Sequence, residues 1–104
     1  MTPDITSARN LPSRSKLYSR RQLLEITGVG EVRLTEILEL GWIDPIMAGN
    51  DEPLFLVRDV YRIGKLQRIA TDFDVCLTGA SIIVDLLDRI ETLEKRVEEL
   101  RRLL

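Results

Sequence analysis

The 104-residue chain contains no histidine and only one cysteine, and these shortages exclude much of catalytic chemistry. Without histidine the chain has neither an imidazole general base nor a metal site built from cysteine and histidine. A single cysteine forms no internal disulfide, so nothing in the sequence points to an oxidising compartment. No apolar run approaches the ~20 residues of a membrane span, and the first residues lack the apolar region of a signal peptide. We therefore expect a cytoplasmic protein with no catalytic residues, no metal and no cofactor.

The charges nearly cancel, but they are unevenly distributed along the chain. Fifteen basic and 17 acidic side chains give a formal net charge of −2, which is unlike the basic footprint of most nucleic-acid binders. Residues 1–30 hold five basic and two acidic side chains, a charge of +3, whereas residues 31–60 hold two basic and seven acidic ones, a charge of −5. The middle of the chain is therefore an acidic block, and its place in the fold decides what it does.

Three regions follow from composition and periodicity. Residues 1–16 mix Pro, Ser, Arg and Thr with no apolar period, which predicts a flexible basic tail. Residues 17–76 alternate short helix signals with turns, which predicts one small domain. Residues 77–104 predict one long helix, too long to be covered by the core of so small a domain.

The first part of that domain has the capping and turn residues of a helix-turn-helix. Ser19 is a good N-cap, and Gln22 completes a capping box with it. Gly28 ends the first helix, and a second helix is predicted from Glu31 to Leu40. Two short helices joined by a glycine turn are typical of the helix-turn-helix motif.

The rest of the domain predicts a wing and a further helix. Residues 44–56 combine two prolines with a turn-prone run, which predicts a hairpin or irregular wing anchored by its last apolar residues. Residues 57–71 return to a helical period with one apolar side and one basic side. The basic side consists of Arg58, Arg62, Lys65 and Arg68.

The last helix carries a heptad stripe. Its apolar residues step alternately by three and four positions, as in a coiled coil, and they are Ile83, Leu86, Ile90, Leu93, Val97, Leu100 and Leu104. We expect Ile83 to Ile90 to pack within the chain, whereas the later positions lie too far from its core. The sequence therefore predicts a homodimer, and the flanking charges favour an antiparallel one. The predicted dimerisation residues are Ile90, Leu93, Val97, Leu100 and Leu104.

These residues together resemble a known family. The spacing of Tyr18, Leu23, Thr27-Gly28-Val29, Leu34, Gly41 and Pro45 is similar to that of the MerR-type winged helix-turn-helix. The resemblance implies a mainly α fold, in which this domain is followed by a long C-terminal coiled-coil helix. It also implies dimerisation, because MerR-type dimers form through an antiparallel coiled coil.

The chain departs from the DNA-binding pattern of that family. Where DNA-binding members carry an Arg-Tyr-Tyr-Glu block on the second helix, this chain has Thr35-Glu36-Ile37-Leu38, and Glu52-Pro53 replaces a Tyr-Arg pair in the wing. Phosphate contacts supply much of the affinity for DNA, and carboxylates facing a polyanion add repulsion. The second helix is thus poorly suited to reading DNA.

The second half of the chain is similar to the chaperone-modulator (CbpM) family. The similarity lies in Arg68…Phe73-x-x-x-Leu77-x-Gly79 and in the later run Leu87-Asp88-x-Ile90-x-x-Leu93. It implies an adaptor that binds the J-domain of a DnaJ/CbpA-type co-chaperone and modulates it, most simply by inhibition. J-domains present a basic helical face, which an acidic surface would complement. The predicted partner-binding residues are Glu31, Glu36, Glu39 and Trp42.

Blander interpretations stay open beside these hypotheses. Glu36 and Glu39 are also consistent with an ordinary solvated face, Trp42 with a core residue under the wing, and Cys76 with buried apolar packing. The alternative function is a DNA-binding transcriptional regulator. Its contacts would come from Arg20, Arg21, Arg58, Arg62 and Lys65.

Overall fold

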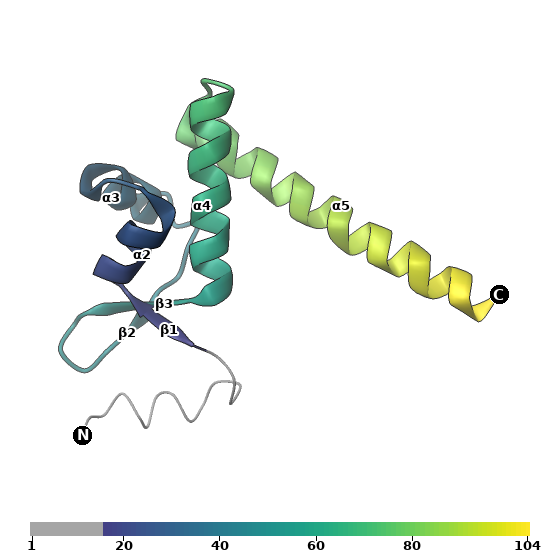
Figure 1. Ribbon diagram of the computed structural model, residues 1–104, viewed down its shortest axis with the longest axis horizontal. Coiled ribbons are helices and arrows are strands. Elements are labelled where there is room, and N and C mark those ends of the chain that lie inside the picture. The colour runs from purple at the N-terminus through teal and green to yellow at the C-terminus, as the bar shows by residue number, and fades with distance from the viewer. Residues whose placement is uncertain (1–15) are drawn as a thin grey trace.

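The computed structural model describes residues 16–104, and the basic tail expected for residues 1–16 lies outside this part except for Lys16. Four helices and a three-stranded sheet make up the described chain. Figure 1 shows three of the helices gathered above the small sheet, while the last helix projects away from them. Within the described residues no helix is both long and apolar enough to cross a membrane.

The helix-turn-helix forms as the sequence predicts. Helix α2 spans Arg20–Thr27 and α3 spans Glu31–Glu39. The Ser19 hydroxyl accepts a hydrogen bond from the Gln22 backbone N–H (3.1 Å), and the Gln22 side chain accepts one from the Ser19 N–H (2.9 Å). Gly28 ends α2 at a φ of 74°, a left-handed conformation that glycine adopts at little cost. The capping box and the glycine turn are thereby confirmed.

The wing is a hairpin that forms part of a sheet. Strand β2 (Ile46–Met47) pairs antiparallel with β3 (Pro53–Leu56), which in turn pairs antiparallel with β1 (Leu17–Ser19). The predicted wing is confirmed, whereas β1 escapes the sequence analysis because three residues show no measurable alternation. In the β1–β3 register Tyr18 lies opposite Phe55, which places the wing directly beneath the start of α2.

One core holds these elements together. Helix α4 (Val57–Asp72) packs against α2 on one side and against α5 (Leu77–Leu103) on the other. The largest fully buried side chains come from every layer of the domain and are Phe55, Leu23, Leu34, Ile37, Ile63, Leu66 and Val84. The apolar side predicted for residues 57–71 is therefore the core-facing side of α4.

Helix α5 begins where the sequence predicts a long helix. Cys76 is its N-cap, and the Cys76 sulfur accepts a hydrogen bond from the Gly79 N–H (3.5 Å). The buried residues of α5 are Ala80, Ser81 and Val84, all in its first turns.

The expected packing of Ile83 to Ile90 within the chain is incomplete. Ile83 is half-buried, but Leu86 and Ile90 are 54% and 50% exposed. The reason is that α4 covers only the first turns of α5. A 27-residue helix is ~40 Å long, so its later residues extend beyond α4. The mainly α, winged helix-turn-helix architecture with a long C-terminal helix is confirmed.

Candidate functional site

The solvent side of α3 carries the carboxylates singled out from the sequence. Leu34 and Ile37 are fully buried, so the helical period turns Glu31, Glu36 and Glu39 to solvent. We call these three residues the acidic face. In a winged helix-turn-helix that binds DNA this helix reads the groove, so carboxylates here oppose phosphate binding.

The three carboxylates are not equally available to a partner. Glu31 forms an ion pair with Arg20 at 3.0 Å, and the Arg20 guanidinium also donates a hydrogen bond to the Thr35 hydroxyl at 3.4 Å. These two contacts connect α2 to α3. Glu36 has only a long ion pair to Arg33 (4.0 Å), a solvent-exposed pair of little energetic value. Within residues 16–104 Glu39 has no ion-pair partner. Glu36 and Glu39 are thus the carboxylates that a cationic partner could reach.

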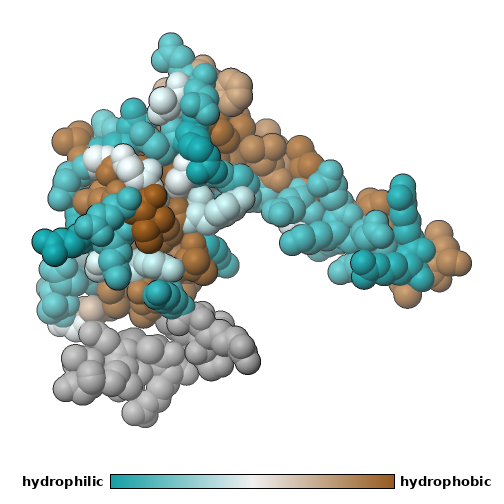
Figure 2. Space-filling view, viewed as in Figure 1, coloured by the Kyte–Doolittle hydropathy of each residue, from teal (hydrophilic) through white to brown (hydrophobic). Residues whose placement is uncertain are grey.

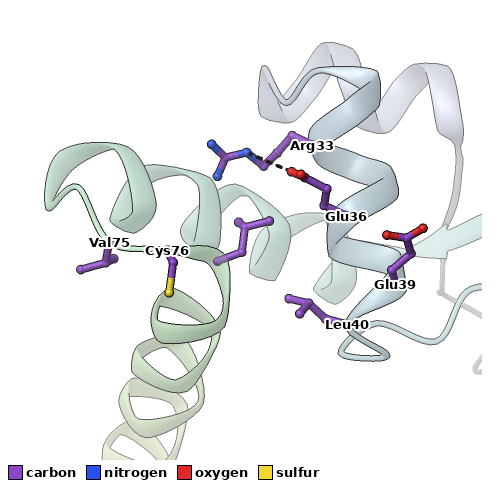
Figure 3. A pocket seen from close by; sticks show the side chains of 7 residues that line it. Arg33, Glu36, Glu39, Leu40, Val75 and Cys76 are labelled. Atoms are coloured by element: carbon purple, nitrogen blue, oxygen red, sulfur yellow. Dashed lines mark ion pairs between the residues drawn. The ribbon is translucent and has the colours of Figure 1, made fainter.

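A groove lies beside these two carboxylates. It has a volume of about 480 Å³ and is lined by Arg33, Glu36, Glu39, Leu40, Val75, Cys76 and Leu77. Figure 3 shows Leu40 and the charged residues on α3 on one side of the groove, with Val75 and Cys76 at the turn between α4 and α5 on the other. The groove therefore combines a charged wall with apolar side chains. We call it the α3–α5 groove.

Cys76 differs from the sequence expectation. It is an exposed free cysteine in the wall of the groove, not a buried apolar residue. Its role as the N-cap of α5 explains the exposure, because a capping residue sits at the end of a helix and not on its buried side. No signal in the sequence brings residues 75–77 beside α3, because that juxtaposition depends on where α4 turns into α5.

Trp42 belongs to a polar cluster with residues of α4 and α5, and neither its hydrogen bond nor its cation–π contact involves the acidic face. The Arg62 guanidinium stacks over its ring (4.1 Å to the centroid), and its indole N–H donates to Asp85 (3.0 Å). Arg62 also pairs with Asp85 and with Asp88 (3.2 Å), and Lys65 reaches Asp88 at 3.5 Å. We call these five residues the Arg62 cluster. The structure thus gives Trp42 a part in holding α5 against α4, and its role in partner binding stays a prediction.

The Arg62 cluster also changes the assessment of the DNA-binding candidates. The side chains of Arg62 and Lys65 are only 26% and 19% exposed, because they are engaged with α5 and not presented to solvent. Arg20 is engaged with Glu31, and Arg58 lies 3.9 Å from Asp59. Of the five candidates, Arg21 alone has no ion-pair partner among the described residues. The sequence does not reveal these contacts because Asp85 and Asp88 lie 23 and 26 residues from Arg62 along the chain.

The projecting part of α5 exposes its apolar stripe. Figure 2 shows apolar side chains interrupting the charged surface along this helix. The residues predicted for dimerisation are half or more exposed: Ile90 50%, Leu93 57%, Val97 51%, Leu100 62% and Leu104 fully. An exposed apolar stripe of this kind is typical of a surface that contacts another helix or protein.

Among residues 16–104 the buried charged side chain is that of Asp59. Burial raises the pKa of the Asp59 carboxyl above its usual value, opposed by Arg58, by the Leu56 backbone amide and by Arg62. Asp59 lies in the first turn of α4, where the helix dipole favours a carboxylate and offsets part of the cost of its burial. Among residues 16–104 no group of three His, Cys, Asp or Glu side chains is placed to hold a metal ion.

The comparisons with known proteins agree with this architecture. A search of the curated proteins found no match to the chain. A scan against protein-family models matched residues 18–102 to the family described as "MerR HTH family regulatory protein". That match runs from β1 through the wing and along nearly all of α5. The chain therefore belongs to the MerR helix-turn-helix family of regulatory proteins.

Proposed function

We propose that this chain is a non-catalytic adaptor that binds the J-domain of a DnaJ/CbpA-type co-chaperone and inhibits it. The observation that carries the proposal is the acidic face, which occupies the helix that DNA-binding relatives use to read the groove. A basic helical partner complements such a surface, and complementary charge mainly raises association rate and specificity. The similarity of residues 68–93 to chaperone modulators supplies the class of partner.

The proposed adaptor acts as a homodimer joined through α5. The stripe from Ile90 to Leu104 extends beyond anything that the chain's own core can cover. Its heptad spacing suits pairing with a second copy of the same helix. Dimerisation would leave both acidic faces free, because the end of α5 projects away from α3 (Figure 1).

DNA-binding regulation is the second candidate, and the family's description as regulatory proteins favours it. Against it stand the charges: the acidic face repels phosphate, and Arg62 and Lys65 are engaged with α5. We therefore place it below the adaptor function. The two candidates differ in a measurable way, since DNA binding falls steeply with salt concentration.

Reversing the two accessible charges tests the adaptor proposal. In the Glu36→Lys/Glu39→Lys variant we expect the dissociation constant for a J-domain to rise about 10- to 100-fold at ~150 mM salt, equivalent to ~1.4–2.8 kcal/mol. The measurement is isothermal titration calorimetry, with circular dichroism to confirm an unchanged helix content. Both residues are exposed, so the substitutions leave the core intact.

The matched control reverses two exposed carboxylates on α5. The Glu91→Lys/Glu99→Lys variant changes the net charge equally but lies far along the projecting helix. Its dissociation constant for the J-domain should stay within about twofold of that of the unmodified protein if the position of the charges, and not the net charge, determines the affinity. Equal loss of affinity in both variants, or loss in neither, would refute the role of the acidic face.

A further inference from the structure

The α3–α5 groove has a property that the acidic face alone lacks, an apolar surface beside its carboxylates. Leu40 is 40% exposed, while Val75 and Leu77 are half-buried and pack against the core. Side chains that the core already holds in place lose little conformational entropy when a partner covers them. Such preformed apolar positions are where binding energy concentrates in protein interfaces, whereas exposed charge pairs contribute little.

Resting on the proposed function, we infer that the α3–α5 groove is the docking site for one amphipathic, basic helix of the partner. Its apolar side chains pack on Leu40, Val75 and Leu77, and its cationic side chains pair with Glu36 and Glu39. The partner thus contacts both the helix-turn-helix and the start of α5, and neither part holds the partner alone.

Charge complementarity identifies the occupant as basic. The charged residues lining the groove are Arg33 against Glu36 and Glu39, which leaves one negative charge in excess. The Arg33–Glu36 contact is long (4.0 Å), so an incoming cation competes with it at small cost. Asp72, the last residue of α4, and Asp74, in the turn that follows it, are both exposed and add to the negative potential.

The spacing and the shape of the groove identify the occupant as helical. Glu36 and Glu39 are three residues apart on one helix, so their side chains neighbour each other at ~5–6 Å. Cations three or four residues apart on a partner helix have the same separation. The groove is an open surface depression and not an enclosed cavity, which suits a helix laid on the surface better than an enclosed small molecule.

Cys76 provides a direct probe, because it lines the groove and is the chain's only cysteine. We expect saturating J-domain to slow its alkylation by a maleimide at least 10-fold. The control is the Cys76→Ser/Glu91→Cys variant, in which serine keeps an N-cap and the new thiol lies on α5, far from the groove. Alkylation of that thiol should be unchanged by the J-domain.

The Leu40→Glu variant separates direct covering of the groove from an indirect effect. It should weaken J-domain binding at least 10-fold and remove the protection of Cys76 at the same J-domain concentration. Val32→Glu makes a comparable substitution on the same helix, at a side chain that is 76% exposed and does not line the groove. The Val32→Glu variant should bind the J-domain as tightly as the unmodified protein does, and the J-domain should protect its Cys76 to the same extent.

A second probe is a synthetic amphipathic helix of leucine and lysine. It tests whether the groove docks a basic helix independently of whether the natural partner is a J-domain. Protection of Cys76 by the J-domain supports both the groove and the adaptor function. Binding of the J-domain without protection overturns the groove and leaves the adaptor function standing. Protection by the peptide, with no binding of the J-domain, supports the groove and overturns the adaptor function. Binding of neither overturns both.

Discussion

Substituting Leu93→Glu and Val97→Glu together is expected to convert the protein from a dimer to a monomer. Both side chains are about half exposed in the single chain, and the heptad pattern places them in the proposed seam. Burying each contributes ~1.5–3 kcal/mol, and a dimer buries each of them twice. The dimer dissociation constant should therefore rise at least ~1,000-fold. Light scattering at ~50 μM should give 11.9 kDa for the variant and twice that mass for the unmodified protein.

The control for this experiment is Lys95→Glu, which changes the charge by the same two units on the outer face of α5. Three features make it a matched control: its place in the same helix, its full exposure and its position off the heptad stripe. It should remain dimeric, because the seam is untouched. A monomeric mass for the unmodified protein, or a dimeric mass for the double variant, would contradict the proposed interface.

Replacing Phe55 by alanine should be the most damaging single change to stability. Its ring is fully buried in β3, at the point where the sheet meets the helices. Phe→Ala substitutions in a core cost ~3–5 kcal/mol, a large fraction of the ~5–15 kcal/mol that holds a domain of this size together. Denaturant unfolding should show this loss as a lowered midpoint, measured at equal protomer concentration because dimerisation adds to apparent stability.

The other phenylalanine, Phe73, is the natural control because it is 70% exposed at the end of α4. Phe73→Ala should change the free energy of unfolding by no more than ~0.5 kcal/mol. If the two variants were destabilised equally, Phe55 could not be the centre of the core that the structure describes.

Local signals in the sequence are enough to predict most of the fold. The Ser19–Gln22 capping box and the Gly28 turn define the helix-turn-helix because capping depends only on neighbouring residues. The period of residues 57–71 identifies the core side of α4 for the same reason. Strand β1 is missed because a three-residue strand exists only by pairing with β3.

The candidate site is less predictable, since it depends on which elements meet in space. The sequence identifies the carboxylates of α3. It does not show that Glu31 forms an ion pair with Arg20, whereas Glu39 has no ion-pair partner within residues 16–104. Likewise, the sequence predicts Arg62 to be a solvated cation. In the structure α4 and α5 cross, and this brings Asp85 and Asp88 into contact with Arg62. The groove beside Cys76 exists only because the turn between α4 and α5 lies next to the end of α3.

We propose that the MerR-type helix-turn-helix of this chain binds a basic protein helix and not DNA. The most direct test of this proposal is a parallel titration of the unmodified protein against a J-domain and against duplex DNA at ~150 mM salt, repeated at ~50 mM. We expect saturable binding of the J-domain at both salt concentrations and no DNA binding tighter than the ~10⁻⁴–10⁻⁶ M of non-specific contacts. Tight, salt-dependent DNA binding with no binding of the J-domain would contradict the account.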